Sequence, residues 1–198
     1  MECQHRIQAA WYNFHKYQKV LTNGSISIKL RMKLFEATVT PCILFGMSAL
    51  PIYQCMMDKI DATRRKMLRK MVGWVRYPDE DWSLTMSRMN ERVNRALVQW
   101  PNSKDWSIRI FSLQWQYACR VRSLPRHSWV VLACKWRPDK VVDHFSNVLP
   151  YCSRGGQLPR WDAKLAAFSI CIFKCDWFNV ALSSEWLSQR DTFFKWCV

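Results

Sequence analysis

Six cationic side chains stand within residues 59–70, and their type and spacing suit the binding of phosphate groups. On a helix, Lys59, Lys66 and Lys70 fall within about 40° of one another, because successive residues turn by about 100°. Ammonium and guanidinium groups bind phosphate oxygens through charge and hydrogen bonds. The spacing is typical of a stripe that follows a nucleic-acid backbone, and also of the solvated face of an amphipathic helix. The residues assigned to this predicted stripe are Lys59, Arg64, Arg65, Lys66, Arg69 and Lys70.

Other basic residues are candidates for further phosphate contacts. Lys29 and Lys33 share one face of a helix predicted within residues 25–36, while Leu30 and Leu34 share another. In the C-terminal part of the chain, arginines alternate in places with apolar or aromatic residues, a pattern that suits contact with stacked bases. The candidates there are Arg120, Arg122 and Arg160.

The charge of the whole chain favours a polyanionic partner. The 198 residues carry a formal charge of +15, made up of +8 over residues 1–75, +1 over residues 76–115 and +6 over residues 116–198. A field of this sign attracts nucleic acid first and anionic membrane second. Hydrophobic residues make up 49% of the chain and glycine only 5 positions, which excludes disordered, collagen-like and low-complexity classes.

A helix over residues 55–72 is the element that must position the stripe. Apolar side chains repeat on another of its faces at helical spacing, which predicts burial of that face. Gly73 follows directly, and glycine is the residue that most often ends a helix in the left-handed conformation. The apolar face is formed by Met56, Ile60, Met67 and Met71.

Residues 37–57 form the longest uncharged stretch, which is long enough to span a bilayer. Pro41 and Pro51 interrupt it, and four hydroxyl or amide side chains dilute it. The sequence therefore predicts two buried helical pieces, broken near the prolines, in place of a membrane span. Upstream, Asn23-Gly24 predicts a turn, and Ser25 or Ser27 is expected to cap the helix that follows.

The helical spacing of apolar residues and the uneven distribution of charge predict a mainly α-helical protein with two basic modules. Residues 1–75 form the first module, residues 76–105 a linker-like segment, and residues 106–198 a second, tryptophan-rich helical module. Within the linker, Asp79-Glu80-Asp81 is interpreted as the cap of a helix N-terminus. In the second module, a helix is expected from Trp161 to Phe173, and most tryptophan rings are expected in the core.

No motif for catalysis, a metal or a cofactor is present. The chain contains no C-x-x-C pair, and Cys134, His144 and Cys152 match no compact zinc site. Gly-rich phosphate loops and the common nucleophile and metalloprotease motifs are also missing. Residues 1–10 do not form a secretory signal, so the nine cysteines are expected to be reduced thiols of an intracellular protein, in the nucleus or cytoplasm.

Five segments together resemble the reverse transcriptases of LINE-type non-LTR retrotransposons. Residues 31–46 are similar to the family segment that follows the palm domain, although Phe45 stands where a tyrosine is usual. Residues 64–73 resemble the basic helix end R-R-x-M-L-R-x-x-x-G. Looser matches follow at residues 136–138, 155–156 and 159–162.

The resemblance implies a thumb, a helical bundle that grips the primer–template duplex, followed by the segment after the thumb. Fingers and palm would lie upstream of Met1, and the Y/F-x-D-D hairpin that holds the catalytic metals does not occur in this chain. The implied function is therefore non-catalytic binding of a DNA, RNA or hybrid duplex. A fingers–palm polypeptide is the implied protein partner, and no cofactor is expected.

Two alternatives remain open at the level of sequence. A polybasic helix beside an apolar segment also suits a cationic membrane-surface protein anchored through residues 37–57. The chain is also compatible with a decayed reading frame that folds poorly, and a cooperative thermal transition would exclude that alternative.

Overall fold

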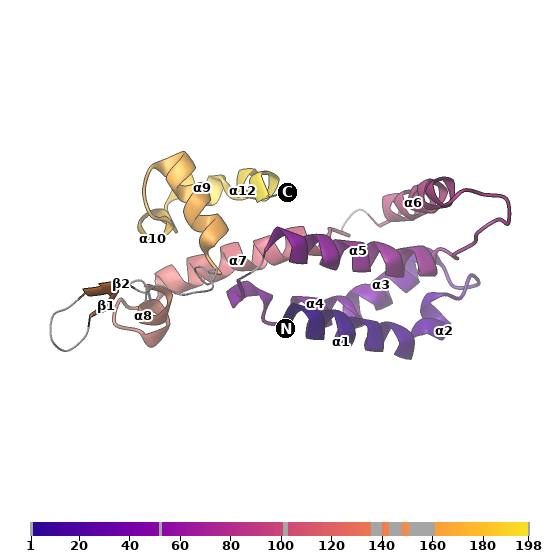
Figure 1. Cartoon of the computed structure of the whole chain (residues 1–198), viewed down its shortest axis with the longest axis horizontal. Coiled ribbons are helices and arrows are strands. Elements are labelled where there is room, and N and C mark those ends of the chain that lie inside the picture. Colours follow the sequence, from indigo (N-terminus) through magenta and orange to yellow (C-terminus); the bar gives the residue numbers. More distant parts are fainter. Residues whose placement is uncertain are drawn as a thin grey trace. The chain divides into compact units, whose positions relative to one another are not determined.

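The computed structural model describes residues 2–51, 53–100, 103–135, 140–142, 148–150 and 161–197 (Figure 1). The fold is mainly helical, which confirms the predicted class. One short antiparallel hairpin, formed by β1 (Lys140–Val142) and β2 (Val148–Pro150), was not predicted. Arg160 and the motif residues at 136–138 and 155–156 lie outside the described residues.

The chain divides into two compact units. Unit 1 comprises Met1–Ser48 and Ile52–Leu113, and unit 2 comprises Ala49–Pro51 and Gln114–Val198. This division differs from the predicted boundaries, because α6 (Trp82–Val98) lies inside the segment interpreted as a linker and packs against the helix before it. The second boundary also differs, since α7 (Trp106–Ser123) contributes residues to both units.

Unit 1 is a bundle of helices around an apolar core. Its long helix α5 (Gln54–Met71) packs against α1 and α6, and α1 also packs against α3 and α4. Phe14, Phe35 and Trp106 form a ring series in the core, with Phe35 and Trp106 stacked at 5.8 Å between centroids. The other elements of this unit are α1 (Glu2–Lys16), α2 (Gln18–Leu21), α3 (Ile28–Thr38), α4 (Thr40–Leu44) and the 3-10 turn η1 (Met47–Ala49).

The uncharged stretch of residues 37–57 supplies core side chains to unit 1, as predicted. Val39, Ile43 and Met47 are fully buried. Pro41 lies in the first turn of α4, where its missing N–H costs no helical hydrogen bond. Upstream, the Ser27 side chain accepts a hydrogen bond from the Leu30 N–H and caps α3. None of the described helices combines the length and apolar character that a bilayer crossing requires.

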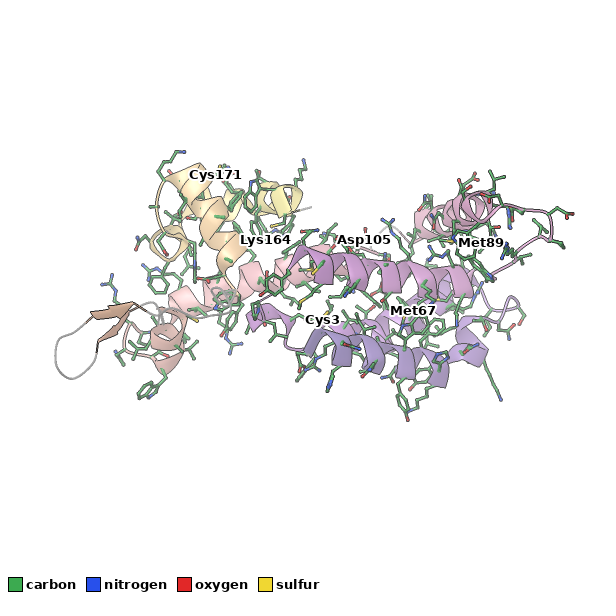
Figure 2. The ribbon with its side chains drawn as sticks, in the orientation of Figure 1. Cys3, Met67, Met89, Asp105, Lys164 and Cys171 are labelled. Atoms are coloured by element: carbon green, nitrogen blue, oxygen red, sulfur yellow. The ribbon has the colours of Figure 1, made fainter. Side chains whose placement is uncertain are left out.

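Helix α5 closely matches the prediction of a helix over residues 55–72. Ile60, Met67 and Met71 are buried, and Figure 2 shows Met67 on the inner side of the helix. Gly73 follows the helix with φ +84°, the left-handed conformation that glycine adopts without strain. Met57 is buried in place of Met56, since Met57 lies two turns before the buried Arg64 and four turns before the buried Met71, on the same face.

The acidic cluster before α6 serves as a helix cap, as predicted. The Asp81 side chain accepts a hydrogen bond of 2.9 Å from the Ser83 N–H. Its neighbour Glu80 pairs with Arg88, nearly two turns into the helix, at 2.6 Å. The hydrogen bond from Arg88 lowers the pKa of the Glu80 carboxyl to about 2, with a smaller contribution from the Thr85 hydroxyl.

The Glu80–Arg88 pair predicts a specific acid sensitivity. The folded-state pKa of Glu80 is about 2 against an ordinary value of 4.5, so its stabilising effect is complete above pH 4.5 and is lost as pH falls toward 2. Glu80→Gln should therefore show a shallower loss of stability across this range, measured as the urea midpoint at several pH values. Glu91→Gln is the control, because Glu91 lies on the same helix and is 69% exposed. Superimposable profiles for Glu80→Gln and the wild type would contradict the assignment.

Unit 2 is built around stacked aromatic rings. Trp115 of α7 stacks on Trp186 at 4.2 Å between centroids, and Phe168 and Phe193 pack around this pair. Trp177 donates its indole N–H to Asp162 at 2.8 Å. The helices of this unit, besides its part of α7, are α8 (Trp129–Lys135), α9 (Ala163–Phe173), α10 (Trp177–Val180), α11 (Ser184–Ser188) and α12 (Arg190–Cys197).

The prediction that C-terminal tryptophans are mostly core holds for part of the set. Trp106, Trp115, Trp177 and Trp186 are buried. Trp129 is 85% exposed and lies largely in solvent, whereas Trp196 is 45% exposed and packs edge-on against Phe168. The expected helix from Trp161 is present as α9 and begins two residues later, at Ala163.

Candidate nucleic-acid interface

The structure separates the six cations of α5 into three groups. Lys59, Arg65 and Lys66 are exposed. Arg69 and Lys70 are half-buried. Arg64 is buried with 1% of its surface exposed, so it cannot reach a phosphate.

Two lysines of α5 lie beside an aromatic ring of α1. The Nζ atoms of Lys66 and Lys70 are 5.8 Å and 5.2 Å from the centroid of the Trp11 ring. His15 stacks on the same ring at 5.5 Å with an interplanar angle of 26°. Each cation–π contact at an exposed site contributes about 0.5–1 kcal/mol and restricts the lysine side chain while its ammonium group stays available.

The lysine stripe runs alongside α1. The two helices run parallel in Figure 1, and Lys59 lies near the start of α1, where its charge acts on Cys3. Burial raises the pKa of the Cys3 thiol, and the positive charge of Lys59 partly offsets that shift. We refer to Trp11, His15, Lys59, Lys66 and Lys70 together as the α1–α5 basic surface.

Trp11 and His15 were absent from the sequence-based set. Their spacing of four residues places both rings on one face of α1. That spacing could have identified Trp11 and His15 as neighbours on one face of a helix. It does not indicate which other helix packs against the two rings.

Arg69 is attached to the neighbouring helix. Its Nη1 donates a hydrogen bond of 3.0 Å to Asn90 Oδ1 of α6. Burial lowers the pKa of the Arg69 guanidinium, and the positive charge of Arg65 adds to the effect. Arg69 is therefore held in place between α5 and α6, whereas Arg65 stays exposed to solvent.

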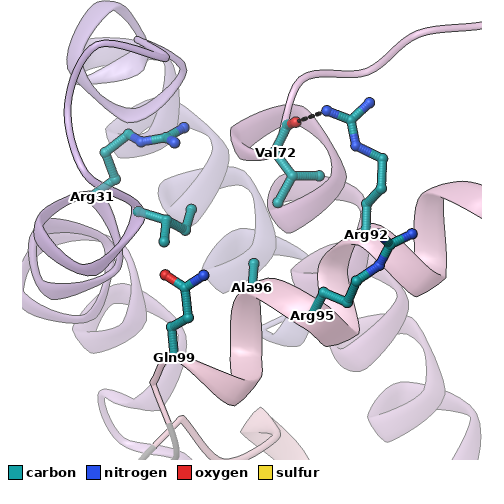
Figure 3. A pocket seen from close by; sticks show the side chains of 7 residues that line it. Arg31, Val72, Arg92, Arg95, Ala96 and Gln99 are labelled. Atoms are coloured by element: carbon teal, nitrogen blue, oxygen red, sulfur yellow. Dashed lines mark hydrogen bonds between the residues drawn. The ribbon is translucent and has the colours of Figure 1, made fainter.

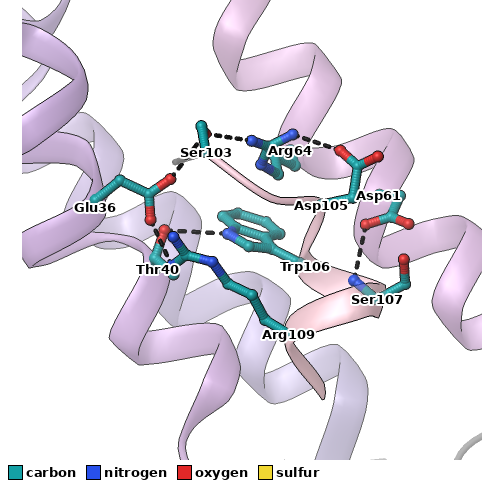
Figure 4. A network of polar contacts seen from close by, with 9 residues as sticks. All are labelled: Glu36, Thr40, Asp61, Arg64, Ser103, Asp105, Trp106, Ser107 and Arg109. Atoms are coloured by element: carbon teal, nitrogen blue, oxygen red, sulfur yellow. Dashed lines mark hydrogen bonds and ion pairs between the residues drawn. The ribbon is translucent and has the colours of Figure 1, made fainter. Parts of the chain in front are cut away.

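The assignment of Arg64 to a phosphate-binding stripe is corrected by its contacts (Figure 4). Arg64 Nη1 lies 2.6 Å from Asp105 Oδ1, and Nη2 donates to Ser103 Oγ at 2.6 Å. Burial lowers the pKa of Arg64, and the nearby Asp105 carboxylate partly compensates. The physical reason is position: residue 64 follows Ile60 by four and precedes Met67 by three, so it lies on the apolar face.

Arg64 belongs to a polar network that fastens the start of α7 to the rest of unit 1. Ser103 Oγ also donates to Glu36 Oε1 at 3.1 Å, and Glu36 pairs with Arg109 at 2.6 Å. We call Glu36, Arg64, Ser103, Asp105 and Arg109 the Arg64 cluster.

Two further hydrogen bonds in Figure 4 reinforce the same attachment. The Trp106 indole N–H donates to Thr40 Oγ1 at 3.0 Å, and the Ser107 N–H donates to Asp61 Oδ1 at 3.1 Å. These bonds join α7 to α4 and α5, so the network has a structural role.

The remaining predicted contact residues lie on other elements. Lys29 and Lys33 are exposed on α3. Arg120 is exposed on the part of α7 in unit 2, and the guanidinium of Arg122 lies 5.2 Å from the Phe178 ring centroid. None of these four is part of the α1–α5 basic surface.

Across the part of the chain that the structure describes, no three His, Cys, Asp or Glu residues are grouped as metal ligands would be. His144 and Cys152, considered above with Cys134, lie outside that part.

Comparisons with known proteins add no family assignment. No protein-family model, no curated protein and no solved structure matches the chain.

Proposed function

We propose that unit 1 binds the phosphate backbone of a nucleic-acid duplex through the α1–α5 basic surface and Arg65. The observation that carries this proposal is the set of Lys59, Lys66 and Lys70 along one edge of α5, with two of them placed against Trp11. At about 1.5 Å per residue, the three lysines extend over roughly 16 Å, which is enough to meet several phosphates of one strand.

The contacts proposed are electrostatic and carry little sequence preference. Phosphate contacts orient a protein on a duplex, whereas base contacts select sequence, and the proposed surface offers mainly cations. The resemblance to the thumb of LINE-type reverse transcriptases indicates the same class of ligand. In that setting the chain would hold primer and template for a fingers–palm polypeptide and would perform no chemistry itself.

Salt dependence gives the direct test of duplex binding. With three to four phosphates contacted by the exposed cations, log K against log[salt] should fall with a slope of about −3 to −4 for B-DNA. Fluorescence anisotropy of a labelled duplex, titrated with the full chain at several salt concentrations, measures this slope. Thermal unfolding of the same sample, followed by circular dichroism, should show one or more cooperative transitions.

Two results would count against the proposal. One is the absence of duplex binding at low salt by a chain that unfolds cooperatively. The other is flotation with neutral lipid vesicles that persists at high salt, since that behaviour belongs to apolar anchoring in a membrane.

A further inference from the structure

Three arginines line one pocket of unit 1. The pocket has a volume of about 270 Å³ and lies where α3, the end of α5 and α6 meet (Figure 3). Arg31, Arg92, Arg95 and Gln99 supply its polar lining, and Ile28 and Ala96 are among its apolar side chains. We refer to this site as the arginine pocket.

Arg31 is fixed in position by backbone carbonyls. Its Nε donates to Ile26 O at 2.9 Å, and its Nη1 donates to Leu21 O at 3.3 Å and to Met71 O. These bonds use one side of the guanidinium, and Nη2 takes part in none of them. The side chain is therefore held rigidly while part of its donor capacity remains.

Arg92 is fixed in a similar way from the opposite side of the pocket. Its Nη2 donates to Val72 O at 2.8 Å, which Figure 3 shows as the dashed line. The carbonyl groups of Met71 and Val72 form the negative end of the α5 dipole, and Arg31 and Arg92 each cover one of them. The carbonyls thus hold the two arginines in place beside the pocket.

Arg95 is the most exposed and most weakly paired cation of the set. Its only acidic neighbour on the described part of α6 is Glu91, at 3.4 Å, and both side chains are 69% exposed. An exposed pair of this kind contributes little, so Arg95 is free to exchange Glu91 for another anion.

From this arrangement we infer that the arginine pocket binds a phosphate-sized oxyanion. Three arginines line one space. Nη2 of Arg31 keeps its N–H donors, and Arg95 can present a fork of two N–H donors to an oxyanion. With a volume of about 270 Å³, the pocket has room for a phosphate group. The inference is independent of the proposed function, because it uses none of the residues of the α1–α5 basic surface.

Calorimetric titration of inorganic phosphate into the full chain tests the pocket, with sodium chloride adjusted to keep the ionic strength constant. The wild type should bind phosphate saturably, and Arg95→Gln should raise Kd about tenfold or more. Arg95→Lys keeps the charge but loses the planar fork, so its Kd should lie between the two. Because Arg95 is largely exposed, both variants should retain the wild-type circular dichroism spectrum.

Lys195→Gln is the matched control, because Lys195 is exposed and belongs to unit 2, outside both the arginine pocket and the α1–α5 basic surface. It should leave the phosphate Kd unchanged. Equal weakening by Lys195→Gln and Arg95→Gln, or no saturable phosphate binding by the wild type, would overturn the inference.

The source of the phosphate group is resolved by two duplexes of the same sequence, one 5′-phosphorylated and one with 5′-hydroxyl ends. If the wild type binds the phosphorylated duplex more tightly than the hydroxyl duplex, and Arg95→Gln removes this difference, the pocket is a site for a strand end. Equal affinity for both duplexes, with inorganic phosphate still bound, supports it as a site for free phosphate. If phosphate binds and neither duplex does, the proposed function fails while the pocket stands.

Discussion

Replacing Arg64 by alanine should destabilise unit 1 by about 3–5 kcal/mol. The substitution removes two hydrogen bonds, to Asp105 and Ser103, and leaves a cavity where a fully buried side chain stood. It also leaves Glu36 facing Arg109 without the second cation of the Arg64 cluster. Urea unfolding of the full chain, followed by circular dichroism, measures the loss as a lower midpoint for the transition of unit 1.

The neighbouring residue provides the control for this change. Arg65→Ala removes the same side chain one position away, where it is exposed, and should alter stability by no more than about 0.5 kcal/mol. Arg65→Ala should lower duplex affinity more than Arg64→Ala does, since Arg65 is available to phosphates and Arg64 is not. Equal stability of the two variants would show that the contacts of Arg64 contribute nothing to the fold.

The double charge reversal Lys66→Glu with Lys70→Glu should weaken duplex binding about a hundredfold at low salt. Each lost charge-assisted contact is worth about 1.5 kcal/mol, or roughly a factor of ten. The salt slope should become shallower by about 1.8, because two phosphate contacts disappear at about 0.9 each. The anisotropy titration described for the wild type measures both quantities.

A matched reversal in unit 2 separates a local contact from the effect of net charge. Lys174→Glu with Lys195→Glu changes the charge of the chain by the same amount at two exposed positions. It should weaken binding far less than the reversal on α5. Equal loss in both variants, or unchanged affinity of Lys66→Glu with Lys70→Glu at matched salt, would refute the role of the α1–α5 basic surface.

The sequence predicted the positions and ends of helices well where these depend only on neighbouring residues. The apolar spacing of α5, the left-handed Gly73, and the caps at Ser27 and Asp81 all depend on residues within one or two turns. Such features depend on residues close together in the chain, so they can be recognised in the sequence without knowledge of tertiary contacts.

Tertiary contacts explain what the sequence did not reveal. Arg64 was assigned by its charge, although its position on the apolar face and its distant partners Ser103 and Asp105 decide its role. Trp11 was missed because a cation–π contact depends on which helix packs beside α1. The boundary between the units was misplaced because α7 continues through it without a break in composition.

The Arg64 cluster also has a consequence for synthesis of the chain on the ribosome. Its members are far apart in sequence, since the residue numbers of partners Glu36 and Ser103 differ by 67 and those of Arg64 and Asp105 by 41. At about 5–20 residues per second, Arg109 is added roughly 4–15 s after its partner Glu36. During that interval the Glu36 carboxylate and the Arg64 guanidinium must be hydrated, because their protein partners have not yet been added. Unit 1 therefore completes its core only when the first turn of α7 has left the exit tunnel.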